Sequence, residues 1–354
     1  MTASRYCCPR CFGDLGLEKD IIPTLSNSKG KCDYCFEMNT LLVEPSKLKD
    51  YFEQVINIYK EEESGIVLVE LLKEDWGLFS NLDIAHSKEL LADIIDDGQI
   101  VRKRFTPSEL CKSDRLTAWV ELRNELMYQN RYFPNTEIDE DRFVNLLSFL
   151  TTTLANISDS WYRARIQKDE HIIDIKEMGA PPNNIASHGR ANPAGIPYLY
   201  LASDEKTAVS EVRPHTGEFI SVANFEVDIE MKVVDLRSPK TTISPFLLGD
   251  ENEIAMLRGD IEFLVHLANE LTRPVLPGSA SIEYIPSQYL CELIKKQGYH
   301  GVIYNSSVGN GINLALFNPG NAAAKSVEKH QVSCVSVEIE NTLEEYSISE
   351  DSHT

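Results

Sequence analysis

The chain has 354 residues, of which 42% are apolar, and its formal net charge is −21. This length suits two domains plus a small module, with enough apolar residues for a buried core. The negative charge disfavours a protein whose main partner is a nucleic acid, because phosphate binding requires a positive surface. We expect no membrane span, since no run of about 18 apolar residues occurs. We also expect a cytoplasmic location, since residues 1–9 lack the features of a secretory signal.

Five of the eight cysteines lie within the first 35 residues. Cys8 and Cys11 form one C-x2-C pair, and Cys32 and Cys35 form a second. Two such pairs place four thiolates around one zinc ion, and clustered cysteines without an export signal indicate metal ligands rather than disulfides. We predict a closed structural zinc site in a module spanning residues 1–40, with Cys7 as the alternative to Cys8.

Residues 41–157 are predicted to form a mainly α-helical domain. Apolar residues at helical spacing predict helices over 47–63, with Ser46 as N-cap, and over 87–95, 117–128 and 139–157. The apolar run 66–72 fits either a helix or a strand. No catalytic spacing occurs in this region, so a scaffold or interaction role is expected.

Near residue 158 Gly, Pro and Asn become frequent, and short strand-like runs alternate with helices. Strands are predicted over 198–202, 219–227, 231–236, 302–304 and 314–317, and helices over 203–212, 260–272 and 287–297. This alternation predicts an α+β fold. Residues 249–259, with Asp250, Glu251 and Glu253, are expected to form a loop, either solvated or covering the site. Residues 331–354 are expected to form an acidic C-terminal tail, which is mobile from Glu338 onward.

Polar residues suited to a dinucleotide recur in this part, and we expect them in loops beside the strands. Arg163 and Arg190 can neutralise a pyrophosphate. Tyr200 can stack on a base, and Glu211 can stabilise a cationic sugar or accept a proton. Taken singly, each also fits a structural role: a surface ion pair, a core position or a solvated helix face. The remaining candidates are Tyr162, Gln288, Ser306 and Ser307.

The order of these residues resembles the RES domain family, which is named after an Arg, a Glu and a Ser. The resemblance is carried by residues 162–163, 189–192, 195–203, 207–212, 286–290, 298–307 and 313–317. It implies an ADP-ribosyltransferase-like RES domain over residues 158–330, with a mixed sheet and flanking helices. Ala191 departs from the family, which usually has a larger residue there.

The resemblance also implies NAD as substrate and cleavage of the nicotinamide–ribose bond, with water, phosphate or a protein as acceptor. Glu211, Arg163 and Ser306 match the family's catalytic positions. Ser306 is preferred to Ser307 because it follows Tyr304 in a Tyr-x-Ser pattern. The residues expected to bind NAD are Arg163, Tyr162, Arg190, Tyr200, Gln288 and Ser306.

Smaller RES proteins are toxins paired with antitoxins, so the resemblance implies a bacterial toxin or defence effector with an inhibitor protein as partner; a homo-oligomer stays open. The N-terminal part is similar to the zinc-knuckle and HEPN-like helical region that precedes longer RES domains. No arginine stands at the HEPN nuclease spacing before His86, so a ribonuclease role is not expected.

Two alternatives to an enzyme remain. One is a nucleotide-sensing module with a degenerate RES pocket. The other is a nucleic-acid-directed protein in which the zinc knuckle docks through Arg5, Arg10, Lys29 and Lys31, with Tyr34 and Phe36 stacking on bases.

Overall fold

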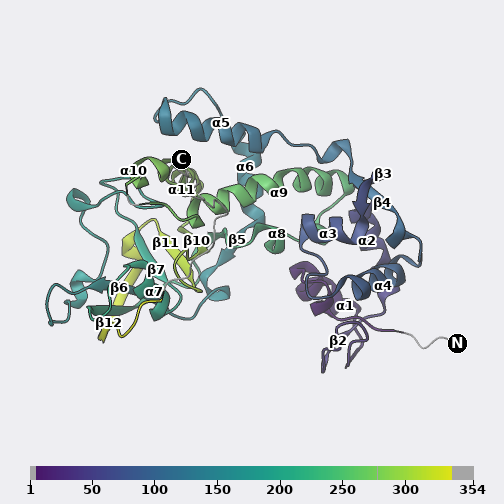
Figure 1. Cartoon of the computed structure of the whole chain (residues 1–354), viewed down its shortest axis with the longest axis horizontal. Coiled ribbons are helices and arrows are strands. Elements are labelled where there is room, and N and C mark those ends of the chain that lie inside the picture. Colours follow the sequence, from purple (N-terminus) through teal and green to yellow (C-terminus); the bar gives the residue numbers. More distant parts are fainter. Residues whose placement is uncertain (1–4, 277, 337–354) are drawn as a thin grey trace, which may run out of the picture.

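A computed structural model describes residues 5–276 and 278–336. The predicted mobile segment with Glu340, Glu344, Glu345, Glu350 and Asp351 lies outside the described residues. A large sheet stands on one side of the molecule and the N-terminal elements on the other, and the long helix α9 (Glu251–Thr272) runs between them (Figure 1). Among the described residues, no helix combines the length and apolar character needed to cross a bilayer.

The N-terminal part of the chain forms short helices and two separate two-stranded sheets. Its strands are β1 (Ser28–Gly30), β2 (Thr40–Leu42), β3 (Tyr59–Val67) and β4 (Arg104–Pro107), and its helices are α1 (Ile22–Leu25), α2 (Lys49–Ile56), α3 (Leu68–Trp76), α4 (Ile84–Ile95), α5 (Arg115–Tyr128) and α6 (Glu140–Phe149). The helices predicted over 87–95 and 117–128 are confirmed. The first begins earlier, because the Asp83 side chain caps it and accepts from the amide of His86.

The helix predicted over 47–63 is wrong in its second half, and Ser46 is not its N-cap. Pro45 opens a 3₁₀ turn over Pro45–Leu48, and α2 ends at Ile56. The chain then enters β3, which pairs with the distant strand β4. Long-range pairing therefore overrides the local helical spacing. The run 66–72 contains both alternatives, since β3 ends at Val67 and α3 begins at Leu68.

The helix predicted over 139–157 is also too long. The Asp139 side chain caps α6, and the helix ends at Phe149. Three β-branched residues then form strand β5 (Thr151–Thr153), which pairs with β9 (Lys232–Asp235). Threonines tolerate helix poorly and suit a strand, so the available sheet edge decides their conformation.

The α+β fold is confirmed: eight strands form one mixed sheet in the order β12-β8-β6-β7-β11-β10-β9-β5. The strands not yet bounded are β6 (Trp161–Ile166), β7 (Leu199–Ala202), β8 (Phe219–Val227), β10 (Gly301–Asn305), β11 (Ile312–Leu316) and β12 (Ala322–Gln331). Only β9 and β10 run parallel; the other pairs are antiparallel. All five predicted strands are present, whereas β6 and β12 were not predicted.

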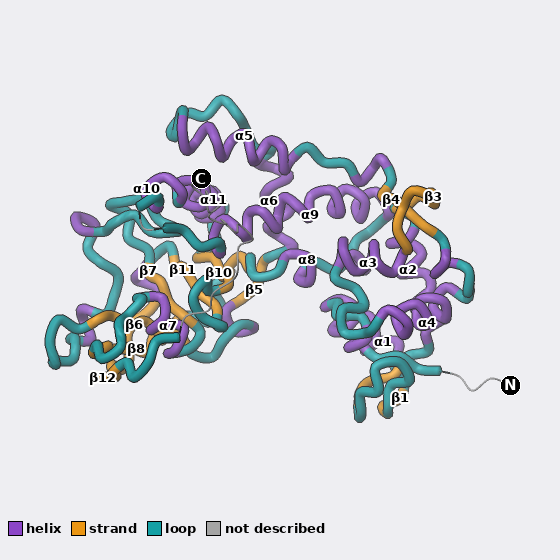
Figure 2. The backbone as a smooth tube through the Cα atoms, viewed as in Figure 1, coloured by secondary structure: helices purple, strands orange, loops and turns teal. Residues whose placement is uncertain are grey.

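The helices that accompany the sheet are α7 (Glu205–Glu211), α8 (Pro239–Thr242), α10 (Ala280–Glu283) and α11 (Ile285–Lys296). Figure 2 shows α10 and α11 on the side of the sheet nearest α9, and α7 beside β6. The helices predicted over 203–212 and 287–297 are confirmed, with Asp204 capping α7 through the Thr207 amide.

The loop predicted over 249–259 is wrong, because Asp250 caps α9 and residues 251–259 are its first turns. Ile254 and Leu257 of these turns are fully buried in the core shared with the N-terminal helices, so the segment does not cover the site. Gly259 allows α9 to approach another backbone, since a Cβ there would lie 2.6 Å from the carbonyl oxygen of Cys111.

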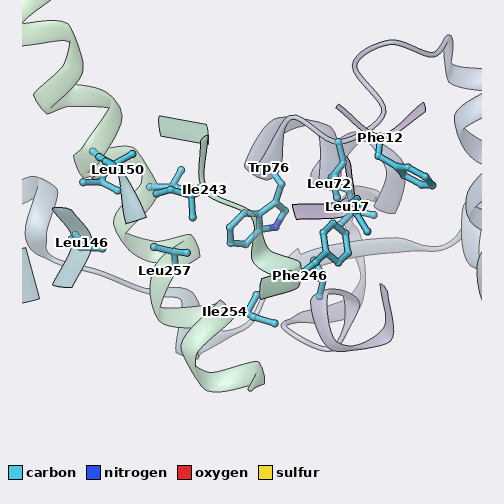
Figure 3. Close-up of a cluster of buried hydrophobic side chains, with 14 of the residues drawn as sticks. Phe12, Leu17, Leu72, Trp76, Leu146, Leu150, Ile243, Phe246, Ile254 and Leu257 are labelled. Atoms are coloured by element: carbon cyan, nitrogen blue, oxygen red, sulfur yellow. The ribbon is translucent and has the colours of Figure 1, made fainter. Parts of the chain in front are cut away.

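One hydrophobic cluster runs from the N-terminal module to α9. Figure 3 shows Phe12, Trp76 and Phe246 in it together with Leu146 and Leu257. The ring centroids of Phe52 and Phe246 lie 4.8 Å apart. The cluster continues onto one face of the sheet through Val302 and Ala315, while a second cluster covers the opposite face. The N-terminal elements and the sheet thus share a continuous core.

Candidate functional site

The four predicted metal-ligand cysteines converge near the N-terminus. The Sγ atoms of Cys8, Cys11, Cys32 and Cys35 all lie within 4.8 Å of one another. Cys8 and Cys35 are 3.4 Å apart, as are Cys11 and Cys32. Four thiolates about 2.3 Å from a central zinc ion would stand roughly 3.8 Å from one another, so the donor set fits a tetrahedral metal.

Cys7 is not part of this cluster. Its backbone pairs with Val43, and its Sγ lies 3.5 Å from the Val43 carbonyl oxygen. The structure therefore selects Cys8 over Cys7. Two of the four nearby cations are engaged in ion pairs: Arg5 pairs with Glu89 and Arg10 with Glu37. These ion pairs leave less free positive charge for a nucleic acid than the sequence suggested.

A row of aligned residues crosses the middle of the eight-stranded sheet. Tyr162 of β6 pairs with Ala202 of β7, Ala202 with Asn313 of β11, and Asn313 with Tyr304 of β10. Side chains of paired residues share a face, so Tyr162, Asn313 and Tyr304 lie on one side of the sheet. Tyr200, two residues before Ala202, lies on that side as well.

Glu211, the last residue of α7, reaches this row through Asn313. Its Oε1 accepts a hydrogen bond from Asn313 Nδ2 at 2.6 Å and another from Ser306 Oγ at 2.7 Å. Within the described residues, Oε2 makes no hydrogen bond. Asn313 is buried, whereas Glu211 is solvent-accessible. The carboxylate is thus fixed at one oxygen and open at the other.

The loop that carries Ser306 is held against the start of α7. The amide of Gly311 donates to Thr207 Oγ1 at 3.2 Å, and the amide of Ser306 donates to the Gly311 carbonyl at 3.1 Å. A Cβ on Gly311 would lie 2.2 Å from Asp204 Oδ2, so only glycine allows this approach. Ser306 is therefore fixed relative to Glu211. Ser307 has no side-chain hydrogen bond within the described residues.

Arg163 lies where β6 and β7 separate. The two strands pair only at Tyr162 and Ala202, and across the opening Arg163 Nη1 donates to the Tyr200 carbonyl at 3.1 Å. Its Nε is buried and has no partner within the described residues. Burial lowers the pKa of Arg163 to about 10, so its guanidinium remains charged at neutral pH. No carboxylate pairs with this buried cation in the described part of the chain, which makes it suited to an anion.

Arg190, Tyr200 and Gln288 belong to a second group, built on the turn around Gly189. Gln288 of α11 donates to the Gly189 carbonyl at 2.8 Å. The Tyr200 hydroxyl donates to Asn192 Oδ1 at 2.7 Å and accepts from the amide of Ala191 at 3.0 Å. These contacts fix the turn, and Ala191 itself is fully buried at its base.

Tyr304 connects the two groups. Burial raises its pKa, and the negative charge of the nearby Glu211 and the Tyr200 phenol raise it further, while Arg190 acts in the opposite direction. Burial also raises the pKa of Tyr200. Both phenols therefore stay protonated at neutral pH and can donate hydrogen bonds.

The expectation that the candidate residues lie in loops is mostly wrong. Tyr162 and Arg163 are on β6, Tyr200 is on β7, Glu211 is on α7 and Gln288 is on α11. Of the candidates, only Arg190, Ser306 and Ser307 are in loops. Asn192, Asn313 and Tyr304 are additional members of the site that had no predicted role. A signal existed for Asn313, since it is a polar residue inside an apolar strand.

Comparisons with known proteins identify a protein family and a similar solved structure. The family model for the RES domain matches residues 160–336. Among solved structures, the chain is similar to the one described as the crystal structure of the M. tuberculosis MbcT-MbcA toxin-antitoxin complex, with 14% identity and a TM-score of 0.32 over 55% of this chain and 94% of that chain. No curated protein sequence matches the chain.

Proposed function

The chain belongs to the RES domain family, and we propose that its RES domain is an enzyme that binds NAD and breaks the nicotinamide–ribose bond. The observation that carries this proposal is the Glu211 carboxylate, held at Oε1 by Ser306 and Asn313 and left open at Oε2. A fixed, accessible carboxylate beside protonated phenols suits a reaction that creates positive charge on a sugar.

NAD binding would use the cations and rings around the central row. Arg190 binds the pyrophosphate. Arg163 alternates with Tyr162 on β6 and pairs with Ala223. Its guanidinium would therefore reach the same anion only through the opening between β6 and β7, where it contacts the Tyr200 carbonyl. Tyr200 and Tyr162 contact the rings or ribose hydroxyls. Gln288 acts by holding the Gly189 carbonyl and hence the turn that carries Arg190.

In the proposed reaction, the bond between ribose C1′ and the nicotinamide nitrogen breaks, and its electron pair leaves with neutral nicotinamide. The developing charge on C1′ is stabilised by Glu211. The acceptor oxygen then bonds to C1′ and loses its proton to Glu211, which is the closest base held over this face. Water, phosphate or a protein side chain can serve as acceptor.

The four-cysteine cluster would hold a structural zinc ion, through Cys8, Cys11, Cys32 and Cys35. Four thiolates close the coordination sphere, and a closed site stabilises a small fold without taking part in catalysis. The chemistry assigned to Glu211 needs no contribution from it.

A cell that makes this enzyme needs a restraint, because uncontrolled NAD loss is lethal. We propose a toxin or defence role and an inhibitor protein that covers the central row. The inhibitor protein should be sought by coexpression with the Glu211→Gln variant, because this variant can accumulate in the host cell without depleting its NAD.

The test is to incubate the full-length protein with NAD and to measure free nicotinamide, with water, phosphate or a cell extract as acceptor. Glu211→Gln should lower kcat by about 10²–10³-fold. Arg163→Lys should raise KM strongly, because the planar bidentate donor is lost. Glu205→Gln is the matched control, since Glu205 is an exposed carboxylate on the same helix. If the wild-type protein binds NAD but releases no nicotinamide with any of these acceptors, the domain is a nucleotide-sensing module and not an enzyme.

A further inference from the structure

Four charged side chains join α5 to the end of α9 and to α10. Arg123 Nε of α5 lies 2.7 Å from Glu270 Oε1, and its Nη2 lies 3.4 Å from Glu283 Oε2. Arg273 Nη2 lies 2.6 Å from Glu283 Oε2, and its Nε lies 3.4 Å from Glu270 Oε2. We call Arg123, Glu270, Arg273 and Glu283 the four-charge cluster.

The four-charge cluster reaches the candidate site through the backbone of Arg273. Arg190 Nη1 donates to the Arg273 carbonyl at 2.7 Å. That carbonyl is free of the helix because Arg273 has left helical geometry, with φ −55° and ψ 139°. Pro274 explains this conformation, since a residue before proline is disfavoured in the helical region. The sequence Arg-Pro at the end of α9 thus creates an acceptor for Arg190.

Arg190 has two further anchors, and one of them lies beside the same cluster. The guanidinium carbon of Arg190 stands 5.2 Å from the centroid of the Tyr284 ring, and Tyr284 directly follows Glu283. Ser287 Oγ donates to the Arg190 carbonyl at 2.5 Å. Two of the three anchors, Arg273 and Tyr284, are therefore in or next to the four-charge cluster.

We infer that Arg123 is a positioning residue for Arg190, although it lies outside the matched residues 160–336. This inference rests on the proposed function, because it assigns Arg190 to NAD. Glu270 is buried, and Arg123 supplies its shortest charge contact. Without Arg123, the 3.4 Å contact to Arg273 is the remaining ion pair of Glu270, so Arg273 is drawn toward it and its carbonyl shifts away from Arg190.

The kinetic test is Arg123→Met in the full-length protein. We expect KM for NAD to rise about tenfold, because this is the effect of losing one charge-assisted hydrogen bond. The value of kcat should change much less. Arg123→Lys should recover part of the loss, because it restores a cation next to Glu270. In an Arg190→Ala background, Arg123→Met should have no further effect on KM, since the residue it positions is absent.

Arg115→Met is the matched control. Arg115 also ties α5 to α9, at 2.7 Å from Asp260 Oδ1, but its contacts lead to Asp260, Ser113 and Asp139 rather than to Arg190. Its variant should lower the melting temperature without changing KM. An equal rise of KM in both variants would show general loosening of the helical contact and would overturn the inference.

Hydrogen exchange gives a readout independent of NAD turnover. In Arg123→Met, the amides of residues 187–200 should exchange faster than in wild type, and in Arg115→Met they should not. If wild type cleaves no NAD, the proposed function fails while this exchange difference still decides whether Arg123 positions Arg190. If exchange and KM are both unchanged in Arg123→Met, the inference is wrong.

Discussion

The cysteine cluster and the candidate NAD site stand at opposite sides of the molecule and are built in different ways (Figure 1). All four thiols of the cluster come from residues 8–35, in two tight turns. The candidate site draws on β6, β7, β10, β11, α7 and α11, and its residues span 162–313. The cluster therefore depends on local geometry and a metal, whereas the site depends on the register of the sheet.

This difference has an energetic consequence. A metal held by four thiolates supplies much of the folding free energy of a small module. In the site, each contact of Glu211 or Tyr200 is one hydrogen bond among many, and the hydrophobic clusters on both faces of the sheet carry the stability. Changes to the cluster should therefore act on folding, and changes to the site on chemistry.

The largest effect should follow Cys32→Ser. We expect loss of the bound metal and unfolding of the N-terminal module, because structural zinc contributes roughly 10 kcal/mol to such folds. Metal content and hydrogen exchange over residues 5–43 measure this. Cys7→Ala is the control, since Cys7 lies outside the cluster and its variant should keep the metal. If Cys32→Ser kept its full metal content, the proposal that the four cysteines stabilise the N-terminal module through a metal would be wrong.

The next effect is that of Glu211→Gln on turnover. We expect kcat to fall by about 10²–10³-fold, because the carboxylate that stabilises the cationic sugar is neutralised. The free energy of unfolding should change by less than about 0.5 kcal/mol, as for most exposed substitutions. Nicotinamide release and a thermal melt measure the two quantities. A large loss of stability would contradict the separation of site chemistry from folding.

Ser306→Ala and Asn313→Ala should have intermediate effects, each lowering kcat about tenfold through the loss of one hydrogen bond to Glu211. The two should differ in stability. Asn313 is buried, so its removal also costs roughly 1–3 kcal/mol of unfolding free energy, whereas Ser306 is more exposed. Equal melting temperatures for the two variants would show that Asn313 does not contribute to the stability of the fold.

A further prediction concerns the pH dependence of stability in the N-terminal module. Burial raises the pKa of Asp14 to about 6, although it accepts a hydrogen bond from Ser244 Oγ at 2.8 Å. Because the folded pKa lies above the unfolded value, the stability that Asp14 contributes is full below about pH 4 and is lost as the pH rises through about 6.

Relative to Asp14→Asn, wild type should therefore lose about 2 kcal/mol of stability between pH 4 and pH 7, as followed by thermal unfolding. Glu18→Gln, a change of an exposed carboxylate in the same segment, should leave the wild-type pH profile unaltered. Parallel pH profiles for wild type and Asp14→Asn would refute the raised pKa of Asp14.

Several elements followed from the sequence because their causes are local. Asp139 and Asp204 cap the helices that the sequence predicted to begin beside them. The strands at 219–227 and 312–316 carry enough apolar residues to be recognised. Errors arose where a distant partner decided the outcome: residues 59–63 became strand through β4, and residues 151–153 through β9. The domain boundaries predicted at residues 40, 157 and 330 stay predictions, as do the roles of the site residues.

The sequence by itself determined three of the four thiols, Cys11, Cys32 and Cys35, because a C-x2-C turn brings its donors together in any context; the choice of Cys8 over Cys7 came from the structure. It also determined which residue types the site contains, since the ordered series from Tyr162 to Phe317 resembles one family. The tertiary structure alone decided how these residues meet. Strand register placed Asn313 against Glu211, and the separation of β6 from β7 left Arg163 with the Tyr200 carbonyl. The packing of α9 on α5 brought Arg123 within three contacts of Arg190, through Glu270 and Arg273. Such neighbours depend on long-range pairing and a shared core, which no local pattern encodes.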